Sequence, residues 1–320
     1  MGKETLFGED IQEIRKKMEE ESYKKGFSKG KLKDSDIVSP YIERMKGEFK
    51  FSDPPSLGID TGNGTAGPLV KELFNELGIR FKGLYLEPDG RFPNHLPDPT
   101  VPEYVRDLIK TVIDEKFLLG IGIDGDGDRI GAIDERGEMV FGDKLAGIFA
   151  GYVLKEHPGE PIVFDVKCSQ GLVDFIKERG GVPVMWKTGH SLLKAKLREL
   201  NAPFAGEMSG HMFFNDRYYG YDDAIYASLR LLEILEKSGK QLSELAGEIP
   251  FYIGTPEIRV TCPDNRKFEV VDALVKTFKD QGYEVVDIDG ARVVFEDGFG
   301  LVRASNTQPV LVLRFEAKTK

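Results

Sequence analysis

The segment from Ile121 to Ile133 constrains the fold most, because it places three aspartates between two apolar runs. The apolar residues 118–123 and 130–133 predict two β-strands that follow one another closely. The loop between them can turn sharply, because two of its residues are glycines, which accept backbone conformations that other residues avoid. It reads Asp124-Gly125-Asp126-Gly127-Asp128-Arg129. The sequence therefore predicts two strands joined by a short loop that gathers three carboxylates.

Neighbouring carboxylates repel one another unless a positive charge offsets them. A hard divalent cation such as Mg²⁺ prefers oxygen ligands and keeps positions for water or a phosphate oxygen. We therefore expect Asp124, Asp126 and Asp128 to bind Mg²⁺. The guanidinium of Arg129 beside them indicates that a further ligand is an anion.

Two other interpretations of this loop need no magnesium. An Asp-Gly hairpin turn can be a solvated acidic turn without any metal. A calcium loop of the EF-hand type also begins with alternating acids and ends with a glutamate, and Glu135 falls at that final position. The EF-hand loop lies between helices, however, whereas the runs on both sides of this loop have the pattern of strands.

Composition restricts the class of protein. The net charge of −10 over 320 residues argues against nucleic acid as a general partner. No apolar run approaches the roughly 20 residues of a membrane span, and the charged N-terminus does not resemble a signal peptide. The two cysteines, Cys168 and Cys262, are far apart, so we expect no disulfide framework and a reducing, cytoplasmic compartment.

The order of strand and helix patterns predicts an α/β protein. Leu57–Asp60 reads as a strand, followed by the glycine-rich turn 61–67 and a helix, which is the start of a βαβ unit. That turn can present N–H groups to a phosphate or serve as a tight connection, and we favour the connection. A second strand–helix–strand pattern begins at Ile162, and strands with one helix follow after Gly254.

We therefore expect two consecutive α/β domains with mixed sheets, followed by a small α+β domain. Residues 1–36 have too little apolar surface to fold alone and read as a tail or linker. The predicted divisions are 1–36 for that segment, 37–156 for the domain with the metal loop, 157–253 for the second domain and 254–320 for the third.

Three further polar segments are candidates for ligand contacts. Lys187 and His190 follow a strand of the second domain, where ligands of open α/β sheets bind, although a single histidine is more often structural. Glu207 and Ser209 lie in a loop suited to sugar hydroxyls, which is otherwise an ordinary connection. The segment Arg303-Ala304-Ser305-Asn306-Thr307 has the chemistry of a phosphate cradle, and its alternative interpretation is a polar hairpin turn.

Together these motifs resemble the α-D-phosphohexomutase family, which comprises phosphomannomutase and phosphoglucomutase enzymes. The loop 124–129 is similar to the magnesium loop of the family, Glu207-Met208-Ser209-Gly210-His211 to its sugar-recognition loop, and residues 303–307 to its phosphate-binding loop. The segments 92–95 and 189–191 also match, and the resemblance covers nearly the whole chain. The three predicted domains would be the second, third and fourth of the family.

The resemblance implies an isomerase that moves a phosphoryl group between the 1- and 6-positions of a hexose through a 1,6-bisphosphate. Mg²⁺ would be the cofactor, and hexose phosphates and hexose 1,6-bisphosphate the partners. Arg129, Lys187 and His190 would assist transfer, while Glu207 and Ser209 hold the sugar. The phosphate contacts would be Arg303, Ser305, Asn306 and Thr307.

One departure concerns the catalytic serine. The family carries it in a first domain, where it is phosphorylated and donates its phosphate, and no serine in this sequence has that context. Residues 1–36 resemble the last helix and tail of that first domain, so we read them as its remnant. We therefore expect a truncated mutase that binds hexose phosphates, is inactive alone and self-associates through the surface left uncovered. The alternatives are a non-catalytic sugar-phosphate binding module and, less favoured, a Mg²⁺-dependent sugar phosphatase.

Overall fold

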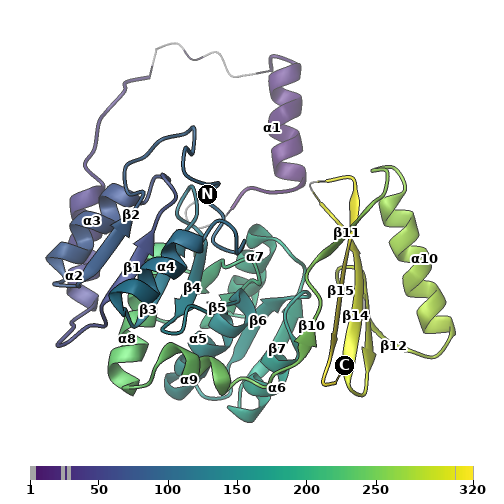
Figure 1. Ribbon diagram of the computed structural model, residues 1–320. Helices are drawn as coiled ribbons and strands as arrows, with labels where there is room; N and C mark the ends of the chain where they lie inside the picture. The colour runs from purple at the N-terminus through teal and green to yellow at the C-terminus, as the bar shows by residue number, and fades with distance from the viewer. Residues whose placement is uncertain (1–4, 23–25, 27–29, 307, 320) are drawn as a thin grey trace.

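The computed structural model of the chain contains three β-sheets that follow one another along the sequence. It describes residues 5–22, 26, 30–306 and 308–319. Figure 1 shows the sheets side by side, with the first at the left and the third at the right. Among the described residues, no helix combines the length and apolarity that crossing a membrane requires.

The first sheet is mixed and has five strands in the order β2-β1-β3-β4-β5. Its strands are β1 (Leu57–Asp60), β2 (Phe81–Leu84), β3 (Leu119–Ile123), β4 (Ile130–Asp134) and β5 (Met139–Val140). Its helices are α2 (Val38–Glu48), α3 (Gly67–Glu76) and α4 (Arg106–Glu115). β1 runs parallel to β2 and β3, whereas β4 is antiparallel to β3.

Alternation of small and large residues along β1 and β3 determines which helices cover which face. Gly58 and Gly120 face α4 so closely that an added Cβ would lie 3.1 Å and 2.8 Å from side chains of that helix. The opposite face carries large apolar residues, among them Ile59 and Ile121, which join a core cluster with residues of α2 and α3. The glycines therefore allow α4 to pack directly on the sheet beneath the metal loop.

The second sheet has four strands in the order β7-β6-β8-β9, which repeats the order of the first four strands of the first sheet. Its strands are β6 (Pro161–Asp165), β7 (Val182–Trp186), β8 (Phe204–Gly206) and β9 (Met212–Phe214). The helices around it are α5 (Gly142–Glu156), α6 (Gln170–Glu178), α7 (His190–Glu199), α8 (Ala224–Ser238) and α9 (Leu242–Gly247). α7 packs on one face through Leu193 and Leu197, while α5 and α6 pack together in the large core cluster.

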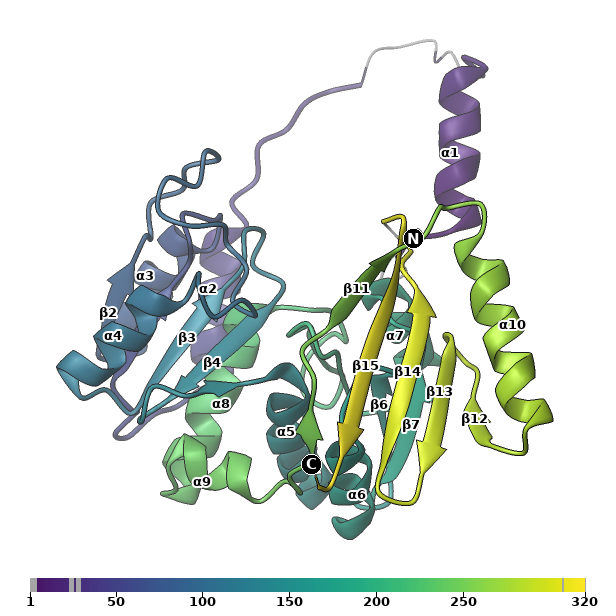
Figure 2. The same ribbon diagram turned by 45° about the vertical axis from the view of Figure 1, so that its right-hand side comes forward.

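The third sheet is antiparallel and has six strands. They are β10 (Ile253–Gly254), β11 (Ile258–Thr261), β12 (Glu284–Val286), β13 (Ala291–Phe295), β14 (Gly298–Ala304) and β15 (Val310–Ala317). A single helix of the described part, α10 (Lys267–Asp280), packs beside β12, β13 and β14 (Figure 2). The predicted fold class, two α/β units with mixed sheets followed by an α+β unit, is confirmed.

The predicted divisions at residues 36, 156 and 253 stay predictions. The helix α5, which they assign to the first domain, packs mainly on α6 and β8 of the second sheet, so a division just before Gly142 fits the packing better. The helix α1 (Glu9–Glu19) has no buried residue and lies apart from the first sheet in both views (Figures 1 and 2).

Candidate active site

The metal loop and the sugar loop predicted from the sequence occupy equivalent positions in the first two sheets. Residues 124–129 connect β3 to β4, and residues 207–211 connect β8 to β9. The loops touch, because the N–H of Ile130 donates to the carbonyl of Gly210 at 3.1 Å. Gly210 has a φ of 99°, and an added Cβ would lie 2.4 Å from the carbonyl oxygen of Ile130. This close approach therefore requires glycine.

The backbone of the metal loop wraps around one carboxylate. Oδ1 of the buried Asp124 accepts N–H groups of Gly127, Asp128 and Arg129 at 3.0–3.2 Å, and Oδ2 accepts Nε of Arg129 at 2.7 Å. Carboxylate oxygens of Asp124, Asp126 and Asp128 all lie within 4.8 Å of one another. Strands flank the loop on both sides, which excludes the EF-hand interpretation.

The electrostatics of this loop favour a cation. Burial raises the pKa of Asp128 to about 6, the charges of Asp124 and Asp126 add to this, and His211 opposes it. Burial is the largest cause, and the two neighbouring carboxylates add negative charge that a bound cation would offset. A donor set made only of carboxylate oxygens suits a hard divalent cation, so these residues fit Mg²⁺.

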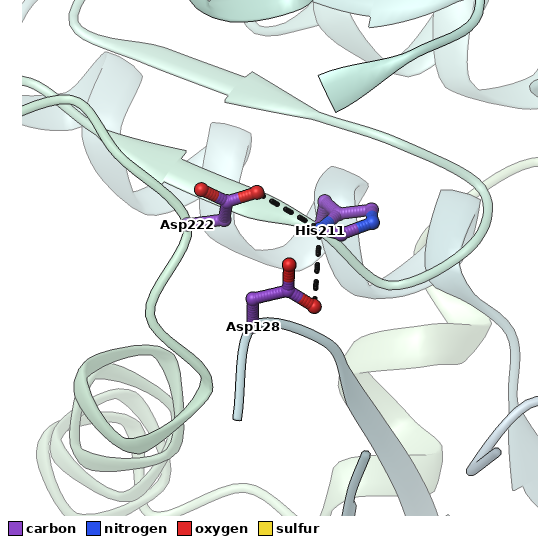
Figure 3. A group of neighbouring side chains, drawn as sticks. All are labelled: Asp128, His211 and Asp222. Atoms are coloured by element: carbon purple, nitrogen blue, oxygen red, sulfur yellow. Dashed lines mark ion pairs between the residues drawn. The ribbon is translucent and has the colours of Figure 1, made fainter. Parts of the chain in front are cut away.

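A histidine that sequence reasoning did not select lies against the metal loop. Nδ1 of His211 is 3.7 Å from Oδ1 of Asp128 and 3.0 Å from Oδ2 of Asp222, so that one ring nitrogen faces both carboxylates (Figure 3). Burial lowers the pKa of His211, but the contact with Asp222 and the charge of Glu207 outweigh burial and raise it. His211 is therefore placed to carry a proton beside the three carboxylates.

Asp222, just before α8, holds three basic side chains. Its carboxylate contacts His211, Nδ1 of His190 at 3.3 Å and Nζ of Lys194 at 2.9 Å. Burial would raise the pKa of Asp222, but these three partners hold it well below its usual range. The rings of His190 and His211 stack with their centres 5.3 Å apart. The structure thus brings the predicted His190 to the metal loop through His211.

The predicted Lys187 is exposed, and no ion pair or hydrogen bond of the described residues joins it to the metal or sugar loop. A different lysine lies nearer. Nζ of Lys167 is 3.7 Å from Oδ2 of Asp165, and its side chain is only 14% exposed. Burial lowers the pKa of Lys167, whereas the carboxylates of Asp165 and Glu207 raise it and prevail.

The sugar loop presents a buried acid with a free acceptor. Glu207 is 5% exposed, and its Oε2 finds no hydrogen-bond partner among the described residues. Burial and the nearby Asp165 raise its pKa. The N–H of Met208 donates to Oδ1 of Asp165 at 2.9 Å, which ties the loop, including Ser209, to the end of β6. An unsatisfied buried acceptor is suited to a hydroxyl of a ligand.

The predicted phosphate loop connects β14 to β15 in the third sheet. Arg303 is 5% exposed and Ser305 is 7% exposed, while Asn306 is exposed. Nη2 of Arg303 is buried without a hydrogen-bond partner among the described residues, so it can donate to an anion. Thr307 lies outside the described residues.

Two segments of the first unit, the glycine-rich turn 61–67 and the segment 92–99, also contact the metal loop. The N–H of Thr65 in the glycine-rich turn donates to the carbonyl of Gly125 at 2.9 Å, which supports the structural role favoured for this turn. In the segment 92–99, Oδ1 of Asp98 is 3.4 Å from Nη1 of Arg129.

A cavity of about 650 Å³ opens beside the metal loop, between elements of the first and third sheets. It is lined by Leu96, Pro97, Asp98, Val101, Tyr104, Asp124, Gly125, Asp126, Arg129 and Arg259.

Lys167 and His211 are the candidate residues that sequence reasoning missed. Lys167 follows the strand β6, so the rule that ligands gather at the carboxyl ends of strands could have found it. His211 stands inside the sugar-loop motif itself, but only its position opposite Asp128 indicates a role of its own.

Comparison with known proteins places these segments in one family. Residues 39–137 match the phosphoglucomutase/phosphomannomutase alpha/beta/alpha domain II, residues 141–252 match alpha/beta/alpha domain III, and residues 257–320 match the C-terminal domain. The phosphomannomutase/phosphoglucomutase of Pseudomonas aeruginosa is 44% identical over 317 residues, which cover 99% of this chain and 68% of that protein.

Solved structures are also similar to this chain. A phosphoglucomutase/phosphomannomutase family protein of Burkholderia thailandensis has a TM-score of 0.92 at 44% identity and covers 98% of this chain and 67% of its own. The N-acetylphosphoglucosamine mutase of Aspergillus fumigatus, solved with GlcNAc-6P and magnesium, has a TM-score of 0.62 at 18% identity over 88% of this chain and 61% of its own, and shares the fold. The identity to the Pseudomonas and Burkholderia proteins, and the matches to three family domains in the order of the three sheets, show that the chain belongs to the phosphoglucomutase/phosphomannomutase family.

Proposed function

We propose that the chain carries the metal-, sugar- and phosphate-binding parts of a phosphohexomutase. The reaction would transfer a phosphoryl group between the 1- and 6-positions of glucose or mannose phosphates through the 1,6-bisphosphate. The observation that carries the proposal is the direct contact of the metal loop with the sugar loop, through Ile130 and Gly210 and through Asp128 and His211. This contact supports a site in which the sugar loop lies beside the candidate ligands of a cation.

Asp124, Asp126 and Asp128 would hold Mg²⁺, as the oxygen donors and the raised pKa of Asp128 support. When bound, Mg²⁺ would neutralise charge on the phosphoryl group that is transferred. The fungal N-acetylphosphoglucosamine mutase was solved with magnesium and a hexosamine phosphate, which is consistent with this pairing of metal and substrate class.

The side chains divide into three roles. Arg129, fixed between Asp124 and Asp98, would donate to oxygens of the transferring phosphate. Glu207, with Ser209, would accept hydroxyls of the sugar. The other phosphate of the substrate would be held in the third sheet by Arg303, Ser305, Asn306 and Thr307.

Proton transfer would fall to the histidine pair. Asp222 contacts Nδ1 of His211, which leaves Nε2 of that ring to exchange a proton with a substrate hydroxyl. His190 would orient His211 by stacking. Because Lys167 is buried beside a carboxylate, we favour it over Lys187 for a contact with substrate. Lys187 stays a prediction from the sequence.

We further propose that these 320 residues bind hexose phosphates without interconverting them. Phosphoryl transfer by this family proceeds through a covalent step that needs a nucleophile. Ser209 lies within the sugar loop and Ser191 within α7, so neither has the context of the phosphorylated serine. The donor would have to be supplied by another segment or chain.

The experiment is calorimetric titration of the chain with glucose 1-phosphate, glucose 1,6-bisphosphate and the mannose equivalents, with and without Mg²⁺. A coupled mutase assay and a phosphate-release assay run alongside. The variant Glu207→Gln should weaken sugar-phosphate binding, whereas Glu178→Gln on the exposed end of α6 is a matched control and should not.

Binding without turnover would support the proposal. Turnover by the chain alone would show that a nucleophile has been overlooked, and phosphate release would favour the phosphatase. Absence of binding would refute the proposed function. Binding with no activity even after a serine-bearing first domain of a relative is added would favour the non-catalytic module.

A further inference from the structure

The arginine of the phosphate loop is already held by a carboxylate from another part of the third sheet. Asp289 lies in the turn between β12 and β13, and its Oδ2 accepts Nε of Arg303 at 2.9 Å. The same oxygen accepts the backbone N–H of Thr188 at 3.0 Å. Thr188 lies between β7 and α7, so Asp289 links the phosphate loop to the second sheet.

From Thr188 the contacts continue to the sugar loop. The hydroxyl of Thr188 donates to Oδ2 of Asp165 at 3.2 Å, and Oδ1 of Asp165 accepts the N–H of Met208 at 2.9 Å. Asp165 is fully buried at the end of the central strand β6. An unbroken series of hydrogen bonds therefore runs from Arg303 through Asp289, Thr188 and Asp165 to the backbone of the sugar loop.

Burial and backbone geometry make this link well defined. Arg303 and Asp289 have side chains that are only 6% and 16% exposed, and charge-assisted hydrogen bonds are stronger and more directional away from water. Gly290, the next residue, has a φ of 107°, and an added Cβ would lie 2.5 Å from the carbonyl oxygen of Val302. This glycine lets the turn lie directly on β14, where Asp289 reaches Arg303.

The contact leaves part of the guanidinium available. Asp289 accepts Nε of Arg303, whereas Nη2 is buried without a hydrogen-bond partner among the described residues. Fixing Nε fixes the plane of the guanidinium and hence the direction of the remaining N–H groups. Asp289 therefore orients Arg303 while leaving donors for an anion.

We propose that Asp289 is a positioning residue that holds the phosphate loop of the third sheet in register with the sugar loop of the second. This inference rests on the proposed function, because it assigns the two loops to two ends of one hexose phosphate. Loss of the link changes the distance between the two ends of the site but leaves each loop intact. A ligand that spans both loops must then be affected more than a ligand that occupies one.

The test compares two ligands on the whole 320-residue chain with excess Mg²⁺, by calorimetry. Inorganic phosphate can occupy the phosphate loop or the metal loop but cannot span the site, whereas glucose 1-phosphate contacts both the sugar loop and the phosphate loop. The variants are Asp289→Ala, which removes the acceptor, and Asp289→Asn, which keeps an acceptor oxygen but no charge. The control is Asp287→Ala, two residues away, because Asp287 is half-exposed and pairs with Lys279.

For Asp289→Ala we expect glucose 1-phosphate to bind at least about tenfold more weakly, because a charge-assisted hydrogen bond is lost. Inorganic phosphate should bind equally well or more tightly, because Arg303 loses a neutralising charge. Asp289→Asn should recover part of the glucose 1-phosphate affinity, and Asp287→Ala should change neither ligand. Equal weakening of both ligands, or no change in either, would overturn the proposal.

A measurement without any ligand separates this proposal from the proposed function. In NMR spectra, Nε–H of Arg303 and the amide of Thr188 should exchange slowly with water in the wild-type chain and in Asp287→Ala, and quickly in Asp289→Ala. If the wild-type chain binds no glucose 1-phosphate, the proposed function fails. The exchange rates still test the contacts of Asp289 in that case. Fast exchange of Nε–H of Arg303 and of the amide of Thr188 in the wild-type chain would refute the link.

Discussion

Replacing Asp128 with asparagine should stabilise the metal-free chain at about pH 8 and abolish its stabilisation by Mg²⁺. In the folded chain, burial and the charges of Asp124 and Asp126 raise the pKa of Asp128 from 3.8 to about 6. The folded state therefore binds this proton more tightly than the unfolded state does. The contribution of Asp128 to stability is largest below its ordinary pKa and is lost as the pH rises through about 6.

The magnitude follows from the size of the pKa change. A pKa raised from 3.8 to about 6 corresponds to about 3 kcal/mol for a fully buried group. The side chain of Asp128 is 26% exposed, and solvent screening lowers the expected effect to about 1–2 kcal/mol. At about pH 8 the ionised carboxylate carries this whole penalty, and asparagine does not.

The assay is urea unfolding at about pH 5 and pH 8, with EDTA or with excess Mg²⁺. In EDTA the wild-type chain should lose stability between these pH values, and Mg²⁺ should restore it at the higher one. Asp128→Asn should lack this part of the pH dependence and should not respond to Mg²⁺. The control Asp114→Asn replaces an acid that is 56% exposed on α4, and should change stability by less than about 0.5 kcal/mol.

An Asp128→Asn variant that is less stable than the wild-type chain at about pH 8 in EDTA would contradict this prediction. That result would mean that the contact with His211 stabilises the carboxylate more than burial and its acidic neighbours destabilise it. Stabilisation of Asp128→Asn by Mg²⁺ to the wild-type extent would instead remove Asp128 from the metal ligands.

Three further predictions concern packing and association. Glu316→Gln should lower the free energy of unfolding by about 2–4 kcal/mol, because Glu316 is 4% exposed and accepts hydrogen bonds from the hydroxyl of Ser169 and the N–H of Gln170. These bonds join the second and third units, and an unchanged urea midpoint would contradict the prediction. Phe149→Ala removes a fully buried ring of the core and should lower the free energy of unfolding by about 3–5 kcal/mol. A decrease of less than about 1 kcal/mol in thermal unfolding would show that the core cluster repacks around the missing ring. Ile14→Asp, on the exposed apolar face of α1, should reduce self-association in sedimentation velocity without lowering thermal stability, whereas a monomeric wild-type chain would exclude the proposed self-association.

Much of the fold could be predicted because it depends on local patterns. Short, mostly apolar runs bounded by turn residues predicted β1, β3 and β6, and the acidic loop between β3 and β4 was identified with its flanking strands. The domain division was harder, because α5 follows the first sheet in sequence but buries its apolar residues against α6 and β8. A helical pattern shows that a helix has an apolar face, but not which sheet that face meets.

The candidate site shows the same limit. Lys187 and Lys167 both follow strands of the second sheet, and their sequence surroundings do not rank them. In the fold, Lys187 is exposed, whereas Lys167 lies against Asp165. The choice between them depends on burial and on neighbours from other strands.

The sequence by itself determined the fold class, the family resemblance and the three loops, because each is written in consecutive residues whose spacing has local physical consequences. Only the tertiary structure decided that His211 contacts both Asp128 and Asp222, and that Asp289 joins Arg303 to Thr188. These contacts join residues far apart in the chain. Their distances and the pKa changes that follow from them depend on how the three sheets pack together, and no local pattern records that packing.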